Sequence, residues 1–145
     1  ISAGSPNIIL RLEGGILSYL ADIDRTNNPY EVGLDRMVDL DQEDDFIGKE
    51  ALREIRLKGP AKKLMGAEIQ GDPIKVFNEE RWPVSINGKK VGSMNALVYS
   101  PRLDKNICYT ILNIEHAKSG QEIIISSPEK ELIATTVDLP WLERA

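Results

Sequence analysis

The first side chains in this sequence that suggest chemistry are Arg11 and Glu13, which lie two positions apart in the stretch RLEGGILSY (11–19). A guanidinium group binds a carboxylate through two parallel hydrogen bonds, a geometry that lysine cannot reproduce. Arg11 is therefore a candidate anchor for an anionic ligand, and Glu13 is a candidate to orient it. The alternative is an ordinary internal or surface ion pair, which contributes little when it is exposed. Local sequence alone favours the ion pair.

Two further features of the same stretch bear on a ligand site. Gly14-Gly15 permits positive φ angles or a close backbone approach, but the glycine pattern and the following helix of a phosphate-binding loop are missing. Tyr19 can stack on a flat ring and offer its hydroxyl group. The residues alone favour a simple turn for the glycines and a half-buried core position for the tyrosine.

The other candidates are weaker. His116 is the only histidine and Cys108 the only cysteine, so Ser-His-Asp or Cys-His catalysis would depend on His116, and nothing places it beside a nucleophile. We expect an exposed structural histidine, a buried cysteine and no metal site. Arg144 can reach an anion if the tail folds back, although fraying of the terminus is the simpler interpretation. Trp82 and Trp141 are expected to be packing anchors.

Two segments of different character must position these side chains. Residues 1–59 carry seven Lys and Arg against twelve Asp and Glu, whereas residues 60–145 carry eleven of each, so the net charge of −5 arises in the first segment. The change falls at Gly59-Pro60, a pair that typically ends a helix. We therefore predict a division into residues 1–59 and 60–145.

The first segment predicts one helix, over about 48–58. Ile47, Ala51 and Ile55 recur at a spacing of four residues, and Leu52 lies beside them, so together they form one apolar face. The acidic run before this helix, at 39–45, lacks the spacing of an EF-hand and is expected to be a solvated loop.

The second segment predicts short antiparallel strands. In 83–93, Asn87-Gly88 favours a two-residue type I′ turn, which would place Val84 opposite Val91 on one face. Further strands are expected at 63–70, 106–114, 121–126 and 131–138. Five or six strands with short connections predict a small antiparallel barrel or sandwich.

Composition limits the classes of function. The chain is 41% hydrophobic and 28% charged, which is enough to form a folded core. It has no apolar run of about 18 residues for a membrane span and no basic stripe for nucleic acid. The first residue is not methionine and no signal-peptide pattern follows, so we expect a processed or truncated chain. A single cysteine favours a reducing compartment: the cytoplasm, or the mitochondrial matrix in a eukaryote.

Six distinctive stretches occur along the chain in the following order: RLEGGILSY (11–19), NPYEVGL (28–34), DFIGKEAL (45–52), GKKVG (88–92), YSPRL (99–103) and DLPW (138–141). Their order and spacing resemble the C-terminal half of the aminomethyltransferase family, whose founder is the T-protein of the glycine cleavage system. The resemblance covers nearly the whole chain. FIGKEAL and the pattern of NP followed by E and GL are its most specific parts.

This resemblance implies an α+β fold. Residues 1–59 would form the end of a folate-binding catalytic domain, and residues 60–145 a small antiparallel six-stranded β-barrel. It also implies transfer of a one-carbon unit to the N5 region of tetrahydrofolate, the expected cofactor. The acidic residue that assists the folate nitrogen in the family lies in the N-terminal half. We therefore expect no catalytic residue among these 145 residues and no activity from them alone.

Matched residue by residue, the folate-contacting arginine and tyrosine of the family correspond to Arg11 and Tyr19. The resemblance implies that Arg11 anchors the folate glutamate and that Tyr19 forms an aromatic wall, with Glu13 beside them. Arg144 is the nearest match to an arginine that often follows the LP-aromatic stretch. These four residues are the expected cofactor-binding set.

The identity of the donor stays open. In the T-protein the donor is an aminomethyl group on a lipoyl carrier protein, which would then be a partner. In the related dimethylsulfoniopropionate demethylases it is a methyl group of a sulfonium. Leu20 follows Tyr19 where the usual T-protein run has glycine, and the stretch GGILSY (14–19) with SPN (5–7) upstream is more similar to the demethylase-like branch than to a standard T-protein. A non-catalytic structural or regulatory module of the same fold is the third alternative.

Overall fold

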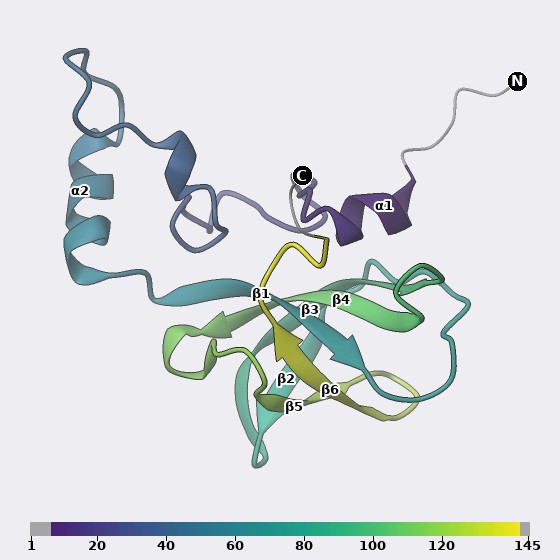
Figure 1. The fold of residues 1–145 in the computed structure, drawn as a ribbon. Helices are drawn as coiled ribbons and strands as arrows, with labels where there is room; N and C mark the ends of the chain where they lie inside the picture. The colour runs from purple at the N-terminus through teal and green to yellow at the C-terminus, as the bar shows by residue number, and fades with distance from the viewer. Residues whose placement is uncertain (1–6, 143–145) are drawn as a thin grey trace, which may run out of the picture.

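The computed structural model describes residues 7–142 and shows six strands that close into an antiparallel barrel (Figure 1). Around the barrel the strands follow the order β1-β4-β3-β2-β5-β6. Their bounds are β1 Lys62–Ile69, β2 Trp82–Ile86, β3 Lys89–Ser100, β4 Lys105–Asn113, β5 Glu122–Ser126 and β6 Glu131–Val137. The predicted six-stranded barrel is confirmed, and the sandwich alternative is wrong because β1 and β6 pair and close the sheet.

The β2–β3 hairpin has the predicted turn but a different register. Asn87 and Gly88 have φ angles of 50° and 74°, as a type I′ turn requires. The predicted pairing of Val84 with Val91 is wrong, because Val84 lies opposite Gly92 and the register shifts by one residue at that point. Val91 is the extra residue of a bulge, yet both valines are buried in the same core cluster.

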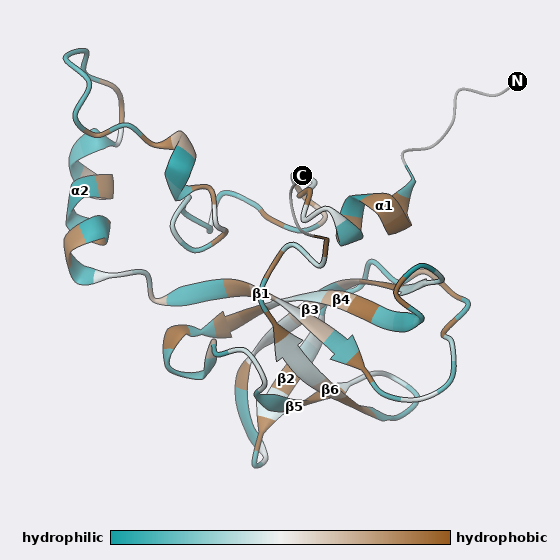
Figure 2. Cartoon of the chain, viewed as in Figure 1, coloured by the Kyte–Doolittle hydropathy of each residue, from teal (hydrophilic) through white to brown (hydrophobic). Residues whose placement is uncertain are grey.

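The barrel has an apolar interior and a second apolar cluster on its outside. Hydrophobic and hydrophilic patches follow one another along the strands (Figure 2). Burial alternates along β5 and β6, as expected for strands with one buried face, whereas β1, β3 and β4 contain longer buried runs. The interior includes the predicted Cys108, and burial raises the pKa of its thiol. Trp82 packs against this interior, and Trp141 packs on the outer cluster, so both act as the predicted anchors.

The outer cluster joins the barrel to the segment that precedes it. Leu12 of helix α1 (Ile8–Glu13) is fully buried there against Tyr109 of β4 and Ala96 of β3. The ring of Tyr109 stacks on that of Trp141 with 5.9 Å between the ring centroids. Helix α1 was not predicted. It begins where the side chain of Asn7 accepts hydrogen bonds from the first backbone N–H groups.

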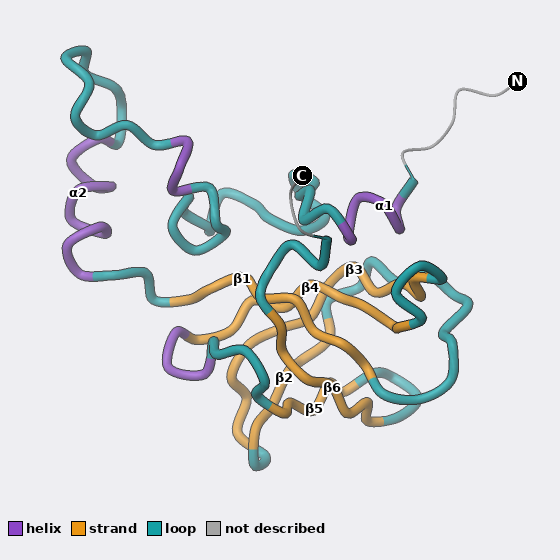
Figure 3. The backbone as a smooth tube through the Cα atoms, in the orientation of Figure 1, coloured by secondary structure: helices purple, strands orange, loops and turns teal. Residues whose placement is uncertain are grey.

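Most of the path from α1 to α2 (Lys49–Lys58) is loop, interrupted by the 3₁₀ turn η1 (Asp35–Met37) (Figure 3). The predicted helix is confirmed, and α2 stands away from the barrel (Figure 1). Its apolar face is only partly covered by the described residues, because Leu52 and Ile55 are half-buried while Ile47 and Ala51 are exposed. The 3₁₀ turn η2 (Ile114–His116) follows β4. His116 lies in it and is half-buried rather than exposed as expected.

Two structural features are absent from residues 7–142, a metal-binding group of side chains and a membrane-spanning helix. Among residues 7–142, no three side chains of His, Cys, Asp or Glu gather into a group that could hold a metal ion. No helix in the same range has the length and apolar character needed to cross a membrane.

Candidate functional site

Arg11 lies in the last turn of α1, but its partner is not Glu13. Its Nη1 donates to Oδ2 of Asp22, whose side chain is fully buried, while the arginine side chain is 12% exposed. The expectation that Glu13 orients Arg11 is therefore wrong, because side chains two positions apart on a helix do not face each other. Guanidinium carries five N–H donors, so this one bond leaves donors available for a ligand.

Glu13 faces the barrel instead. Its Oε1 accepts a hydrogen bond of 2.5 Å from Oγ of Ser100, at the end of β3. Its Oε2 lies 3.7 Å from Nε of Arg102, in the turn that follows. Glu13 is only 1% exposed, so its carboxylate fixes α1 on the barrel. Its place in the cofactor-binding set stays a prediction.

Asp22 is the central buried charge of this region. In addition to Arg11, its Oδ2 accepts from the backbone N–H of Ser18 at 2.7 Å, and its Oδ1 lies 3.4 Å from Nδ2 of Asn95 in β3. Asp22 was not predicted as a site residue. No local pattern separates it from the other acidic residues of the first segment, and its partners become visible only when the chain is folded.

Tyr109 of β4 binds the other side of the same segment. Its hydroxyl oxygen lies 3.3 Å from the carbonyl oxygens of Arg11 and Leu12 and 3.2 Å from that of Ile16. The first two carbonyls belong to the last turn of α1 and that of Ile16 follows the helix, where regular helical hydrogen bonding ends. Burial raises the pKa of Tyr109, and the nearby negative charge of Asp22 raises it further. The hydroxyl therefore stays protonated and able to donate.

Replacing Tyr109 by phenylalanine is expected to loosen α1 and leave the barrel intact. The ring and its stacking on Trp141 remain, while the donor to the carbonyls of residues 11–16 is lost at a cost of about 1–2 kcal/mol. Hydrogen exchange should speed up at amides of residues 9–16. Amides of β5 and β6 should keep their protection, and equal acceleration there would contradict a local role for the hydroxyl.

A groove of about 560 Å³ opens beside the Gly14-Gly15 turn. Its lining residues are Gly14, Gly15, Ile16, Leu17, Tyr19, Ile23, Leu34 and Arg36. Gly15 has a φ of 68°, so the predicted turn is confirmed. Tyr19 is 58% exposed and not the half-buried core residue that local sequence favoured, which leaves its ring available in the groove. Arg11 and Glu13 do not line it.

A smaller recess of about 160 Å³ shares Gly15, Leu17, Leu34 and Arg36 with this groove. It extends along 32–34 to residues 138–140 at the end of the barrel chain. Three stretches that were singled out in the sequence, 11–19, 28–34 and 138–141, therefore converge on one concave surface. Arg36, which is exposed and lines both depressions, was not predicted. Arg144 lies outside the described residues.

The stretches 28–34 and 45–52 also build local structure. In 28–34, the side chain of Asn28 accepts from the backbone N–H groups of Tyr30 and Glu31, and the carbonyl of Glu31 accepts from the backbone of Leu64 in β1 at 2.7 Å. In 45–52, the ammonium of Lys49 is held by the carbonyls of Gln42 and Asp44. The acidic run at 39–45 is accordingly a mostly exposed loop closed by one lysine.

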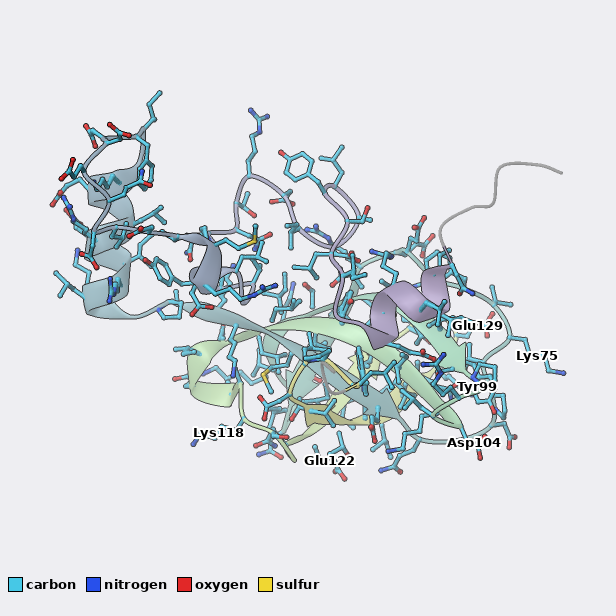
Figure 4. The ribbon with its side chains drawn as sticks, turned by 45° about the horizontal axis from the view of Figure 1, so that its top comes forward. Lys75, Tyr99, Asp104, Lys118, Glu122 and Glu129 are labelled. Carbon is cyan, nitrogen blue, oxygen red and sulfur yellow. The ribbon has the colours of Figure 1, made fainter. Side chains whose placement is uncertain are left out.

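The end of the barrel formed by the β3–β4 turn carries a surface hydrogen bond and a second groove. Tyr99 donates its hydroxyl to Oδ1 of Asp104 at 2.6 Å across the β3–β4 turn (Figure 4). A groove of about 380 Å³ lies at this end of the barrel, where Lys75 and Glu129 also lie (Figure 4). Its apolar lining comes mainly from Ile74, Val76 and Phe77 of the β1–β2 loop, and the β5–β6 turn adds Glu129 and Lys130.

Comparisons with known proteins agree on one family. The family described as the glycine cleavage T-protein C-terminal barrel domain matches residues 62–143. The chain is 33% identical to the dimethylsulfoniopropionate demethylase DmdA of Ruegeria pomeroyi over 89% of its own length and 34% of that protein. It is 36% identical to the aminomethyltransferase of Herpetosiphon aurantiacus over 91% of its own length and 36% of that protein.

A solved structure shows the same fold. The glycine cleavage system aminomethyltransferase T from Bartonella henselae superposes with a TM-score of 0.79 at 22% identity, covering 92% of this chain and 37% of that one. The chain thus spans about a third of the length of the curated relatives it matches. These matches include the barrel and extend into the segment before it.

Proposed function

We propose, from the premise that this chain belongs to the glycine cleavage T-protein family, that it is the C-terminal part of a tetrahydrofolate-dependent one-carbon transferase. In this proposal residues 1–59 are the end of the folate-binding domain and residues 60–145 are the barrel domain. Tetrahydrofolate receives the one-carbon unit at its N5 region, and the acid that assists that step lies in the part of the longer protein that precedes these residues.

The observation that supports this proposal is the convergence of 11–19, 28–34 and 138–140 on one concave surface. Tetrahydrofolate has a flat bicyclic ring at one end and glutamate carboxylates at the other. An exposed tyrosine and a guanidinium group are the side chains that suit such a molecule, and the groove volume lies within the usual range for small-ligand sites. We assign Tyr19, which lines the groove, to the ring. We assign Arg11, which lies outside the groove lining, to the carboxylates, with Arg36 of the groove as a second cation.

Two donors fit the proposal. An aminomethyl group on a lipoyl carrier protein is the donor of the T-protein branch. A methylated sulfonium such as dimethylsulfoniopropionate is the donor of the demethylase branch, which the stretch GGILSY with SPN upstream favours. Leu20 has a φ of 75° and is 73% exposed. Leucine in this left-handed conformation is strained by about 1 kcal/mol or more.

Removing the guanidinium of Arg11 is expected to weaken binding of tetrahydrofolate. Calorimetric titration of the full-length gene product should show an affinity about tenfold lower or worse for Arg11→Ala, because a charge-assisted hydrogen bond to the ligand is lost. Arg11→Lys keeps the positive charge without the planar guanidinium group, so its affinity for tetrahydrofolate should lie between that of Arg11→Ala and that of the unmodified protein.

Arg56→Ala is the matched control, because Arg56 is an exposed arginine on α2. It should bind tetrahydrofolate like the unmodified protein. If Arg11→Ala and Arg11→Lys both fold and bind with unchanged affinity, Arg11 does not belong to the folate site.

A further inference from the structure

Strand β3 is irregular at the point where it passes the segment that carries Arg11. Its pairing with β4 shifts register between Asn95 and Val98. Ala96, inside this irregular stretch, has a φ of 53°, a left-handed conformation that alanine adopts only at an energetic cost. Bulges of this kind re-aim a side chain and often occur beside functional sites.

Asn95 is a polar side chain at this irregularity and is nevertheless only 1% exposed. Its Nδ2 lies 3.4 Å from the carbonyl oxygen of Ala21, 3.3 Å from that of Asp22, and 3.4 Å from Oδ1 of the Asp22 side chain. All of these acceptors belong to the turn that follows the Gly14-Gly15 stretch. The amide group of Asn95 therefore links the barrel to this turn.

The carboxylate of Asp22 is held from two sides. Oδ1 faces Asn95, while Oδ2 accepts from Nη1 of Arg11 and from the backbone N–H of Ser18. A carboxylate that is fully buried depends on such partners, because removal from water is costly for an ion. With both oxygens engaged, the carboxylate plane is fixed, and the fixed carboxylate sets the direction of the guanidinium.

We propose that Asn95 and Asp22 are positioning residues for Arg11, so that the barrel contributes to folate binding through the bulge of β3. Neither residue lines the groove. Asn95 orients Asp22, Asp22 orients Arg11, and Arg11 meets the anionic end of the ligand. This inference rests on the proposed function, and it adds a route by which the barrel acts on the site.

A double-mutant cycle tests this inference. Tetrahydrofolate is titrated into the full-length gene product carrying Asn95→Ala, Arg11→Ala, or both. Asn95→Ala should weaken binding by about threefold to tenfold, and the double variant should bind no more weakly than Arg11→Ala alone, because residues that act through one another are not additive. The thermal unfolding midpoint is recorded for each variant.

Asn106→Ala is the matched control. Asn106 is also a buried amide on a barrel strand, and it binds the β1–β2 loop by accepting from the backbone N–H of Ile74 at 2.8 Å and donating to the carbonyl of Asp72 at 3.0 Å. Its replacement should lower the unfolding midpoint to a similar extent without changing the affinity for tetrahydrofolate. An equal loss of affinity in Asn106→Ala would show a general effect of destabilisation and overturn the inference.

The remaining outcomes separate this inference from the proposed function. If Arg11→Ala weakens binding while Asn95→Ala leaves it unchanged, Asn95 does not position Arg11 and only the inference fails. If the two losses multiply in the double variant, Asn95 acts independently of Arg11 and the inference fails again. If Arg11→Ala itself binds normally, both the inference and the assignment of Arg11 to the folate site are wrong.

Discussion

Asp22→Ala is expected to lower the free energy of unfolding by about 3–5 kcal/mol, because it leaves the guanidinium of Arg11 buried without its partner. The same change removes the acceptor for the backbone N–H of Ser18 and one of the three acceptors for the amide of Asn95. The decrease in the free energy of unfolding is measured by urea denaturation, in which the unfolding of the barrel is followed.

Two comparisons make this prediction specific. Asp138→Ala removes an exposed pair with Lys63, whose charged atoms are 3.6 Å apart, and should cost less than about 1 kcal/mol. Replacing Arg11 and Asp22 together by apolar residues of similar size should cost less than Asp22→Ala alone, because no charge is then left buried. Equal losses for Asp22→Ala and Asp138→Ala would contradict the buried ion pair.

Gly92→Ala is expected to disrupt the barrel, with a loss of about 3 kcal/mol or more. A Cβ at this position would overlap the carbonyl oxygen of Ile111 and lie 2.9 Å from Cδ2 and 3.0 Å from Cα of Leu112. The obstacle is mainly backbone of β4, which pairs directly with this part of β3. The strands can separate only by breaking their hydrogen bonds.

The neighbouring Ser93→Ala is the control for this change. It removes a partly buried hydroxyl on the same strand without adding volume, so its unfolding midpoint should stay close to that of the unmodified protein. If Gly92→Ala unfolds at the same midpoint as Ser93→Ala, the close approach of β3 and β4 is wrong.

The barrel was predictable because its signals are local. The Asn87-Gly88 pair fixes a tight turn, and short apolar stretches between turn residues predict the strands. The bulge at Val91 was not predictable, since the pairing that was expected and the pairing that occurs both bury Val84 and Val91. Helix α1 is too short, at six residues, for its apolar spacing to be recognised, and it depends on packing of Leu12 against the barrel.

The candidate site was predictable only in part. Arg11 and Tyr19 were identified by their chemistry and by resemblance, and the structure places Tyr19 in the groove. The partner of Arg11 was predicted wrongly, because nearness in sequence pointed to Glu13. Asp22 and Asn95 are 73 positions apart, and their contact depends on a turn and a strand bulge that no local pattern predicts.

The most direct test of the central claim is the product that the full-length protein forms from tetrahydrofolate. The protein is incubated with tetrahydrofolate and either dimethylsulfoniopropionate or an aminomethyl-lipoyl carrier protein, and the folates are identified by mass spectrometry. We predict methyl-tetrahydrofolate from the first donor, or methylene-tetrahydrofolate with ammonia from the second, and a strongly reduced yield in Arg11→Ala. A folded protein that forms neither product with either donor would contradict the proposed transferase and favour a non-catalytic module of the same fold.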